Sequence, residues 1–221
     1  MHEINYFLHI TKTAGGSIKA LLKQNLSEKA IFHNGHSNLP SIDSSIDVIF
    51  GHFLHDLHEN YPDFNHSYSC FLRNPVNRVI SHYHHLYNVD QSKVGNKIRN
   101  SGKDINEYFL DYNHWEFSNA MCKIIAGIKH HEQKWTDETI LTQAIENLRK
   151  FKFIGIFELM QLSMFELSKK YNLDISNVPK VNIGNYKMQS INDDTIKEIK
   201  RINRYDIILY KFAIDQFLKR L

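Results

Sequence analysis

The 221-residue sequence has few cysteines, glycines and prolines. It contains two cysteines, Cys70 and Cys122, together with 9 glycines and 4 prolines. Two cysteines are too few for a disulfide framework in a chain of this length, and each lies in an apolar run, as buried reduced cysteines do. The composition therefore excludes a disulfide-stapled scaffold and favours a reducing compartment.

The sequence also lacks a long hydrophobic run and a strong excess of one charge. The net charge is +3 and the pI is near 8.7, so no pervasive basic field of the kind that coats nucleic acid is present, although a local basic pocket could hold a small polyanion. No apolar run approaches the roughly 18 residues of a membrane span, and a strand-like segment begins almost at once, which leaves no room for a signal peptide. We therefore expect a cytoplasmic protein without a membrane span or a nucleic-acid partner.

Short β-type runs alternate with helical patterns in the first part of the chain. The β-type runs are 4–10, 48–50, 69–72 and 151–156. The last two are nearly all apolar, as buried parallel strands tend to be. After the third run, Asn74 is placed as a helix N-cap and Pro75 as the first helical residue. This alternation predicts an α/β fold of P-loop-like type, with a central parallel sheet and helices on both faces.

The second half of the sequence is mostly helical in pattern. Amphipathic segments are expected at 105–112, 116–126, 137–149 and 159–171, with a closing helix around 202–213. Residues 88–104 and 174–192 are interpreted as loops, the second as a long ordered loop or lid. No linker or internal repeat is visible, so we expect residues 1–221 to form a single domain.

The first motif is "YFLHITKTAGGSIKALL", which predicts a strand, a polar loop and the start of a helix. Loop amides and the first helical turn direct N–H groups and a partial positive charge at one spot, which suits an anion. Gly15 and Gly16 let the backbone approach closely, Thr13 and Ser17 supply hydroxyls, and Lys12 supplies a full charge. The lysine precedes the glycines, unlike the G-x-x-x-x-G-K-[ST] triphosphate motif. The alternative is an ordinary turn in which the glycines only ease the geometry.

The second motif is "SCFLRNPVNRVISHYHHL", again a buried strand followed by a capped helix. Arg73 lies at the strand end, where ligands bind in open α/β sheets. It could contact a phosphate through two hydrogen bonds, with the Ser81 hydroxyl directed at the same group. The alternative is that Arg73 caps a neighbouring carbonyl and Ser81 is an ordinary surface serine. Two anion-suited strand ends in one sheet indicate a ligand with two separated anionic groups.

The two motifs resemble the cofactor-binding signatures of sulfotransferases that use 3′-phosphoadenosine 5′-phosphosulfate (PAPS), most closely those of the carbohydrate 2-O-sulfotransferases (heparan/uronyl). "SNAMCKIIAG", "FIGIFELMQLSM" and "NRYDIILYKFA" are similar to later family segments, so the resemblance spans most of the chain. It implies that Lys12 contacts the bridging oxygen and the sulfuryl group, and that Arg73 and Ser81 bind the 3′-phosphate. The residues that it implies for the 5′-phosphosulfate are Thr13, Ala14, Gly15, Gly16 and Ser17. The sequence departs from the family at Thr11, where proline is frequent, and at Asn74, where aspartate is frequent.

His52 is the candidate general base. In "DVIFGHFLHDL" it follows a short apolar strand and a glycine, which would present it at a strand end beside the donor. An unperturbed histidine titrates near pH ~6.5, close to the working range of a general base. The resemblance agrees, since the 2-O-sulfotransferases carry a catalytic histidine in a Gly-His pair. A purely structural role for His52 is the alternative, and His55 is the nearest competing base.

The remaining histidines and the 174–192 loop are not assigned a role in the predicted chemistry. His52, His55 and His58 are spaced by three, but zinc sites use tighter signatures. His82, His84 and His85 in "SHYHHLY" are expected to be solvated on the outward face of their helix, where they could line the acceptor cleft. Asn182 and Lys187, in the 174–192 loop, are plausible polar contacts to a nucleotide outside the main prediction.

The sequence thus predicts transfer of a sulfuryl group from PAPS to a hydroxyl, expected on a saccharide, by direct in-line attack. Lys12 would stabilise the leaving phosphate and His52 would accept the proton, with PAP as product and no metal required. Two rivals stay open. One is a P-loop-type nucleotide-dependent kinase, and the other is a non-catalytic module that binds a nucleotide or a sulfated glycan.

Overall fold

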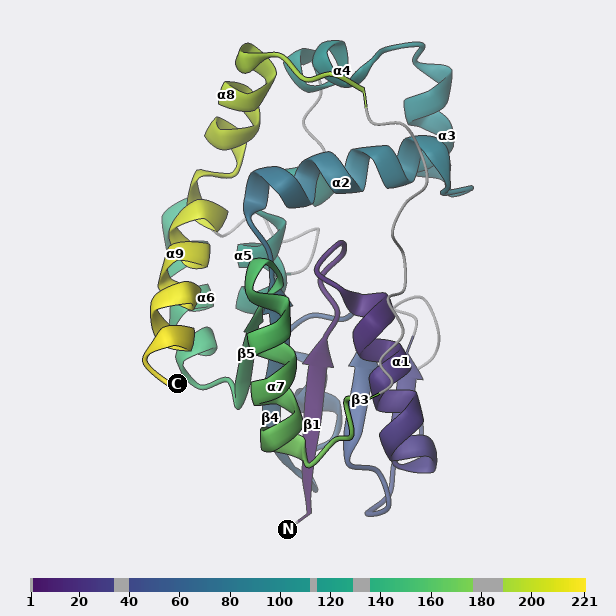
Figure 1. The fold of residues 1–221 in the computed structure, drawn as a ribbon, viewed down its shortest axis with the longest axis vertical. Coiled ribbons are helices and arrows are strands. Elements are labelled where there is room, and N and C mark those ends of the chain that lie inside the picture. The colour runs from purple at the N-terminus through teal and green to yellow at the C-terminus, as the bar shows by residue number, and fades with distance from the viewer. Residues whose placement is uncertain (1, 34–39, 112–114, 129–135, 177–188) are drawn as a thin grey trace.

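The structure is a computed structural model that describes residues 2–33, 40–111, 115–128, 136–176 and 189–221 (Figure 1). The strands are β1 (Glu3–Leu8), β2 (Ala30–His33), β3 (Val48–Gly51), β4 (Asn65–Leu72) and β5 (Phe153–Ile156). The helices are α1 (Gly15–Leu26), α2 (Pro75–Asn88), α3 (Lys93–Asn100), α4 (Ile105–Asp111), α5 (Ala120–Ala126), α6 (Asp137–Arg149), α7 (Met160–Tyr171), α8 (Asp193–Ile202) and α9 (Arg204–Leu218).

The five strands form one parallel sheet in the order β2-β3-β1-β4-β5. Leu8 of β1 pairs with Gly51 of β3 on one side and with Cys70 of β4 on the other. The carboxyl ends of the central strands therefore lie together at one edge, and the loops that follow them meet there. This confirms the predicted P-loop-like α/β sheet.

Helices cover both faces of the sheet, as expected. Alternate residues of β1 point to opposite faces: Ile4 and Leu8 pack in a cluster with α5, α6 and α9, whereas Phe7 packs in a cluster with α1 and α7. A third apolar cluster joins α2, α3, α4 and α8 beyond the carboxyl edge of the sheet, in the upper part of Figure 1. The strand ends thus lie between the sheet and this helical cap.

Three elements differ from the prediction. β2 was missed; it is a four-residue strand at the sheet edge with two half-buried residues, so its apolar pattern is weak. α3 lies within the stretch 88–104, which was predicted to be a loop. The helix was missed because its sequence is mostly polar and only Gly95 and Ile98 are buried. α8, which starts at the N-cap Asn192, had not been predicted.

A buried polar network joins α5 to α9. Asn119 Oδ1 accepts hydrogen bonds from the N–H groups of Tyr205 and Asp206, and the Asp206 carboxylate accepts from Met121 and Cys122 at 3.1 and 2.8 Å. Each helix therefore caps the other through a side chain. This explains why "SNAMCKIIAG" and "NRYDIILYKFA" form a structural pair.

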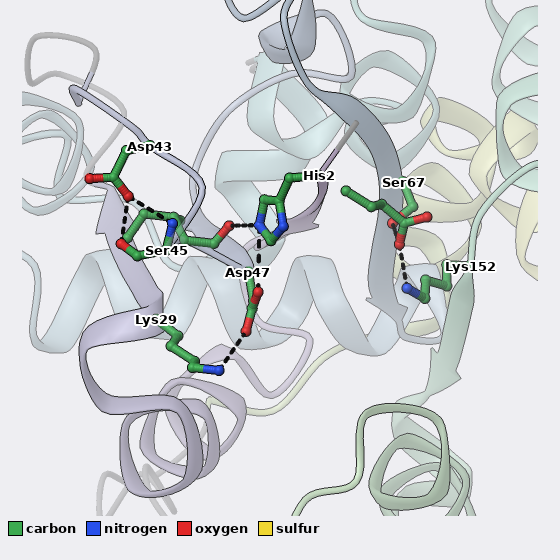
Figure 2. Close-up of polar contacts among 9 residues, drawn as sticks. His2, Lys29, Asp43, Ser45, Asp47, Ser67 and Lys152 are labelled. Carbon is green, nitrogen blue, oxygen red and sulfur yellow. Dashed lines mark hydrogen bonds and ion pairs between the residues drawn. The ribbon is translucent and has the colours of Figure 1, made fainter.

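Polar contacts fix the amino-terminal edge of the sheet (Figure 2). Asp47 lies 3.5 Å from both His2 and Lys29, and His2 also contacts the Ile46 carbonyl at 2.7 Å. On the other side, Lys152 pairs with Glu3. These half-exposed pairs each contribute little to the free energy of folding. They lie at the opposite end of the sheet from the carboxyl edge, where the loops after the central strands meet.

Candidate functional site

The loop after β1 has a strained backbone suited to anion binding. Lys12 and Ala14 have positive φ angles of 67° and 78°, values that cost an L-residue about 1–2 kcal/mol each. α1 begins at Gly15, and its N-cap residue, Ala14, makes no side-chain capping hydrogen bond. Alternating left-handed residues and an uncapped helix start direct backbone N–H groups into a concave anion site. The predicted strand, loop and helix are thus confirmed.

The Thr13 hydroxyl closes the loop internally. It is buried and donates to the Ile10 carbonyl at 2.8 Å. The hydroxyl proton of Thr13 is therefore already used in this hydrogen bond. The backbone N–H of Thr13 is the donor that is available to an anion. Ser17 lies half-buried in the first turn of α1.

Arg73 and Lys12 meet at the ends of the neighbouring strands β4 and β1. Arg73 Nη1 donates to the Lys12 carbonyl at 3.1 Å, so Arg73 does cap a neighbouring carbonyl, as its alternative interpretation expected, and its guanidinium lies over the Phe157 ring at 4.2 Å. Burial, and then the charge of Arg73, lowers the pKa of Lys12. The two cationic side chains therefore repel each other, a repulsion that an anion bound beside them would relieve.

Asn74 replaces the frequent aspartate without loss of the helix cap. Its Oδ1 accepts from the N–H groups of Val76 and Asn77 at 3.1 and 3.3 Å. Its own N–H donates to Glu158 at 2.9 Å, and Tyr210 donates to the same carboxylate at 2.5 Å. The turn that carries Arg73 is thereby tied to the end of β5 and to α9.

Ser81 lies half-buried on α2. His85 is one turn further along the same helix, and the pKa of His85 is lowered by burial and by the charge of Lys12. Residues four apart share a helix face, so the face of α2 with Ser81 and His85 is turned toward the loop. The expectation that His85 faces solvent with its neighbours is met only in part, because His85 is half-buried on this face of α2.

His52 lies exposed just beyond β3, at the same edge of the sheet as Lys12. Its ring stacks on that of His9, with centroids 4.1 Å apart and an interplanar angle of 30°, and His9 in turn stacks on Phe50 at 5.1 Å. Burial foremost, then His52, lowers the pKa of His9 to about 3. His9 is therefore neutral near pH 7. His9 was not predicted as a site residue, because in the sequence it is one more residue of the β-type run 4–10.

The competing histidine, His55, has different surroundings. Its ring packs on Tyr68 at 4.2 Å and on Phe151 at 5.7 Å. Burial lowers the pKa of His55 to about 4. It is held in an aromatic cluster rather than beside the anion loop.

The expectation that His82 and His84 face solvent is wrong. Both are buried, and His82 Nε2 lies 2.6 Å from Glu116 Oε2. The reason is that α3, α8 and α9 pack along α2, and the Trp115–Phe117 turn packs on His82, whose ring lies 5.3 Å from that of Phe117. Within the described ranges, no cluster of three or more His, Cys, Asp or Glu side chains suits a metal ion. Asn182 and Lys187 lie outside the described residues.

Two cavities differ in their relation to this edge. A cavity of about 160 Å³ adjoins the loop and is lined by His9, Gly15, Gly16, Lys19, Phe32, His33, Phe50, Gly51 and His52. A larger one of about 480 Å³ lies beside β5, α7 and the end of α9, where Lys152 and Phe153 mark the start of β5. The larger cavity is thus away from the carboxyl ends of the strands, and of these two cavities only the smaller belongs to the candidate site. In the part of the chain that is described, no helix is both long and apolar enough to cross a bilayer.

Comparisons with known proteins agree with this geometry. Heparan-sulfate 6-O-sulfotransferase 2 of Homo sapiens is 23% identical over 186 residues, which cover 72% of this chain and 31% of that protein. Heparan-sulfate 6-O-sulfotransferase 3 of Mus musculus is 25% identical over 183 residues, or 71% of this chain and 39% of that protein. The chain thus spans about a third of the length of these relatives. Their names specify 6-O rather than 2-O transfer, so the expected sulfotransferase family with carbohydrate relatives is confirmed at that broader level.

Among solved structures, mouse sulfotransferase SULT7A1 complexed with PAP covers 94% of this chain and 65% of its own, at 11% identity and a TM-score of 0.40. That score is too low to support the fold assignment, which rests on the strand order given above. The profile described as the sulfotransferase family matches residues 5–213, from the first strand to the last helix. Because that match includes both the loop around Lys12 and the turn around Arg73, the chain belongs to the sulfotransferase family.

Proposed function

We propose that the protein transfers a sulfuryl group from PAPS to a hydroxyl of a saccharide acceptor. The observation that carries this proposal is the convergence of the Lys12 and Arg73 cations at adjacent strand ends, where Arg73 lowers the pKa of Lys12 and Arg73 Nη1 lies 3.1 Å from the Lys12 carbonyl. PAPS carries two separated anionic groups, and these two motifs offer two cationic sites. The names of the heparan-sulfate relatives support a saccharide acceptor.

The residues of the loop fit the 5′-phosphosulfate. The left-handed backbone at Lys12 and Ala14 and the start of α1 at Gly15 supply N–H donors. Ser17 adds a hydroxyl in the first turn. After the neighbouring strand β4, Arg73 and Ser81 would bind the 3′-phosphate, since Arg73 lies just before α2 and Ser81 is about two turns along that helix.

The reaction needs a base, an acceptor and a stabilised leaving group. His52 takes the proton of the acceptor hydroxyl as its oxygen attacks sulfur. The bond between sulfur and the bridging oxygen breaks, and the electron pair remains on the phosphate of PAP. Lys12 stabilises that developing negative charge, because its ammonium group is fixed beside the phosphate before reaction. Neither a covalent sulfo-enzyme nor a metal ion is required by this route.

Radiolabelled donor tests the proposal. Wild type should transfer label to a hydroxyl acceptor, and His52→Ala should lose roughly 10²–10⁴-fold of that rate, the usual contribution of a positioned base. His66→Ala is a matched control, since His66 is also exposed but lies in the amino-terminal half of β4. Nucleotide binding without turnover in wild type would instead favour the non-catalytic module.

A chelator separates sulfuryl transfer from the kinase alternative. Phosphoryl transfer by P-loop enzymes depends on Mg²⁺. Transfer of the less charged sulfuryl group, with Lys12 stabilising the leaving phosphate, does not. Sulfuryl transfer should therefore persist in EDTA. ATP-dependent phosphorylation that EDTA abolishes would support the kinase.

A further inference from the structure

The cavity of about 160 Å³ beside the loop is placed to receive the acceptor. It lies between the first turns of α1 and the ends of β2 and β3. Gly15 and Gly16 line it from the start of α1, and His52 lines it from the residue after β3, so it adjoins both the proposed donor site and the proposed base. Its volume is below the roughly 300–1,000 Å³ of pockets that enclose whole drug-sized ligands, so it suits one small ring rather than a chain.

The strand order decides which side of the donor this cavity occupies. β1 lies between β3 and β4. Arg73 follows β4, so a donor held by Lys12 and Arg73 extends from β1 toward β4. His52 and the cavity lie on the β3 side. An acceptor hydroxyl that approaches sulfur opposite the leaving phosphate therefore comes from the side on which the cavity lies.

The cavity combines aromatic walls with a cation. Phe32 and Phe50 are in tilted contact at 6.0 Å and offer apolar surface to the C–H groups of a ring. Lys19 Nζ lies 5.7 Å from the Phe32 centroid. The charge of Lys19 also contributes to the lowered pKa of His9, which places the ammonium near the cavity wall. The start of α1 adds partial positive charge.

From this lining we infer that the cavity binds a single-ring unit of the acceptor that carries an anionic group, and that Lys19 selects for that group. The inference rests on the proposed sulfuryl transfer. Lys19 is then a specificity-determining residue, because it pairs with the acceptor rather than with the donor.

Two acceptors that differ at one group test this role. Methyl β-glucuronide carries a carboxylate where methyl β-glucoside carries a hydroxymethyl group. With labelled donor, wild type should favour the glucuronide in kcat/KM by about tenfold, the effect of one charge-assisted hydrogen bond. Lys19→Met should remove most of that preference. Calorimetric binding of the glucuronide to the protein with PAP should weaken in the same variant.

Lys23→Met is the matched control. Lys23 is one turn further along α1 and its Nζ lies 5.4 Å from the same Phe32 ring, but it does not line the cavity. The control should keep the preference. Equal loss in both variants, or an unchanged preference in Lys19→Met, would overturn the inference while transfer itself continues. Absence of transfer to either sugar or to any other hydroxyl acceptor, with PAP still bound, would overturn the proposed function as well.

Discussion

The imidazole rings of His9 and His52 stack with their centroids 4.1 Å apart. His9 also fills the space above Gly15, where an added Cβ would lie 1.6 Å from His9 Nε2. One half-buried, neutral ring therefore contacts both the anion loop and the proposed base. The separation of the anion loop from His52 is thus set by the packing of His9 between them.

Gly15→Ala should destabilise the fold by about 1–3 kcal/mol, because the new methyl group overlaps the His9 ring and forces it out of its stacked position. Urea unfolding measures the loss. The double variant Gly15→Ala/His9→Ala should recover part of it, since the smaller side chain vacates that space. Purely additive effects would contradict the steric explanation.

Lys12→Met should lower kcat by roughly 10²–10³-fold, the usual loss when one donor to a developing anion is removed. Initial rates with labelled donor measure this. Lys23→Met, which changes an exposed lysine of the following helix α1, should stay near the wild-type rate. A rate for Lys12→Met equal to that of the control would remove Lys12 from the mechanism.

Arg73→Ala should weaken binding of PAP by about 1.5–3 kcal/mol, the range for a hydrogen bond to a charged group. Isothermal calorimetry is the direct measurement. Arg149→Ala is a suitable control because Arg149 also lies over an aromatic ring, that of Phe212, but on α6. Unchanged affinity in Arg73→Ala would mean that the second motif does not bind the nucleotide.

Stability should fall as the pH drops below about 6.5. Burial lowers the pKa of His55 to about 4 and that of His9 to about 3. A depressed folded pKa contributes stability that is complete above the unfolded value and is lost as the pH falls toward the folded one, because the unfolded chain binds the proton first. Urea midpoints between pH 8 and pH 4 should show this slope, and His55→Phe should flatten it. An identical slope in the variant would contradict the assignment.

Asp206→Ala should destabilise the protein by about 3–5 kcal/mol, since it leaves the buried cation of Arg78 and two N–H groups of α5 without the carboxylate. Thermal or urea unfolding measures the change. Asp215→Ala on the same helix, where the carboxylate pairs with Lys219 at the surface, should cost less than about 1 kcal/mol. Comparable losses in the two variants would argue against the buried network.

Local chemistry made much of the fold predictable. Pro75 and Asn74 fix the start of α2 through φ and a side-chain cap, and the periodicity of 137–149 predicted the bounds of α6. The edge strand β2 and the polar helix α3 were missed because few of their residues are buried, so their patterns carry little signal. His82 and His84 were misplaced because a second layer of helices covers their face, and a helix pattern shows only its apolar side.

The sequence by itself determined that Lys12, the two glycines and Arg73 follow buried strands, and that the chain resembles a sulfotransferase. These features depend on neighbours in the chain. Only the tertiary structure decided that β1 lies between β3 and β4, so that Arg73 and His52 flank the loop on opposite sides, and that His9 joins the loop to His52. Strand order and ring stacking depend on packing between segments far apart in sequence, which no local pattern records.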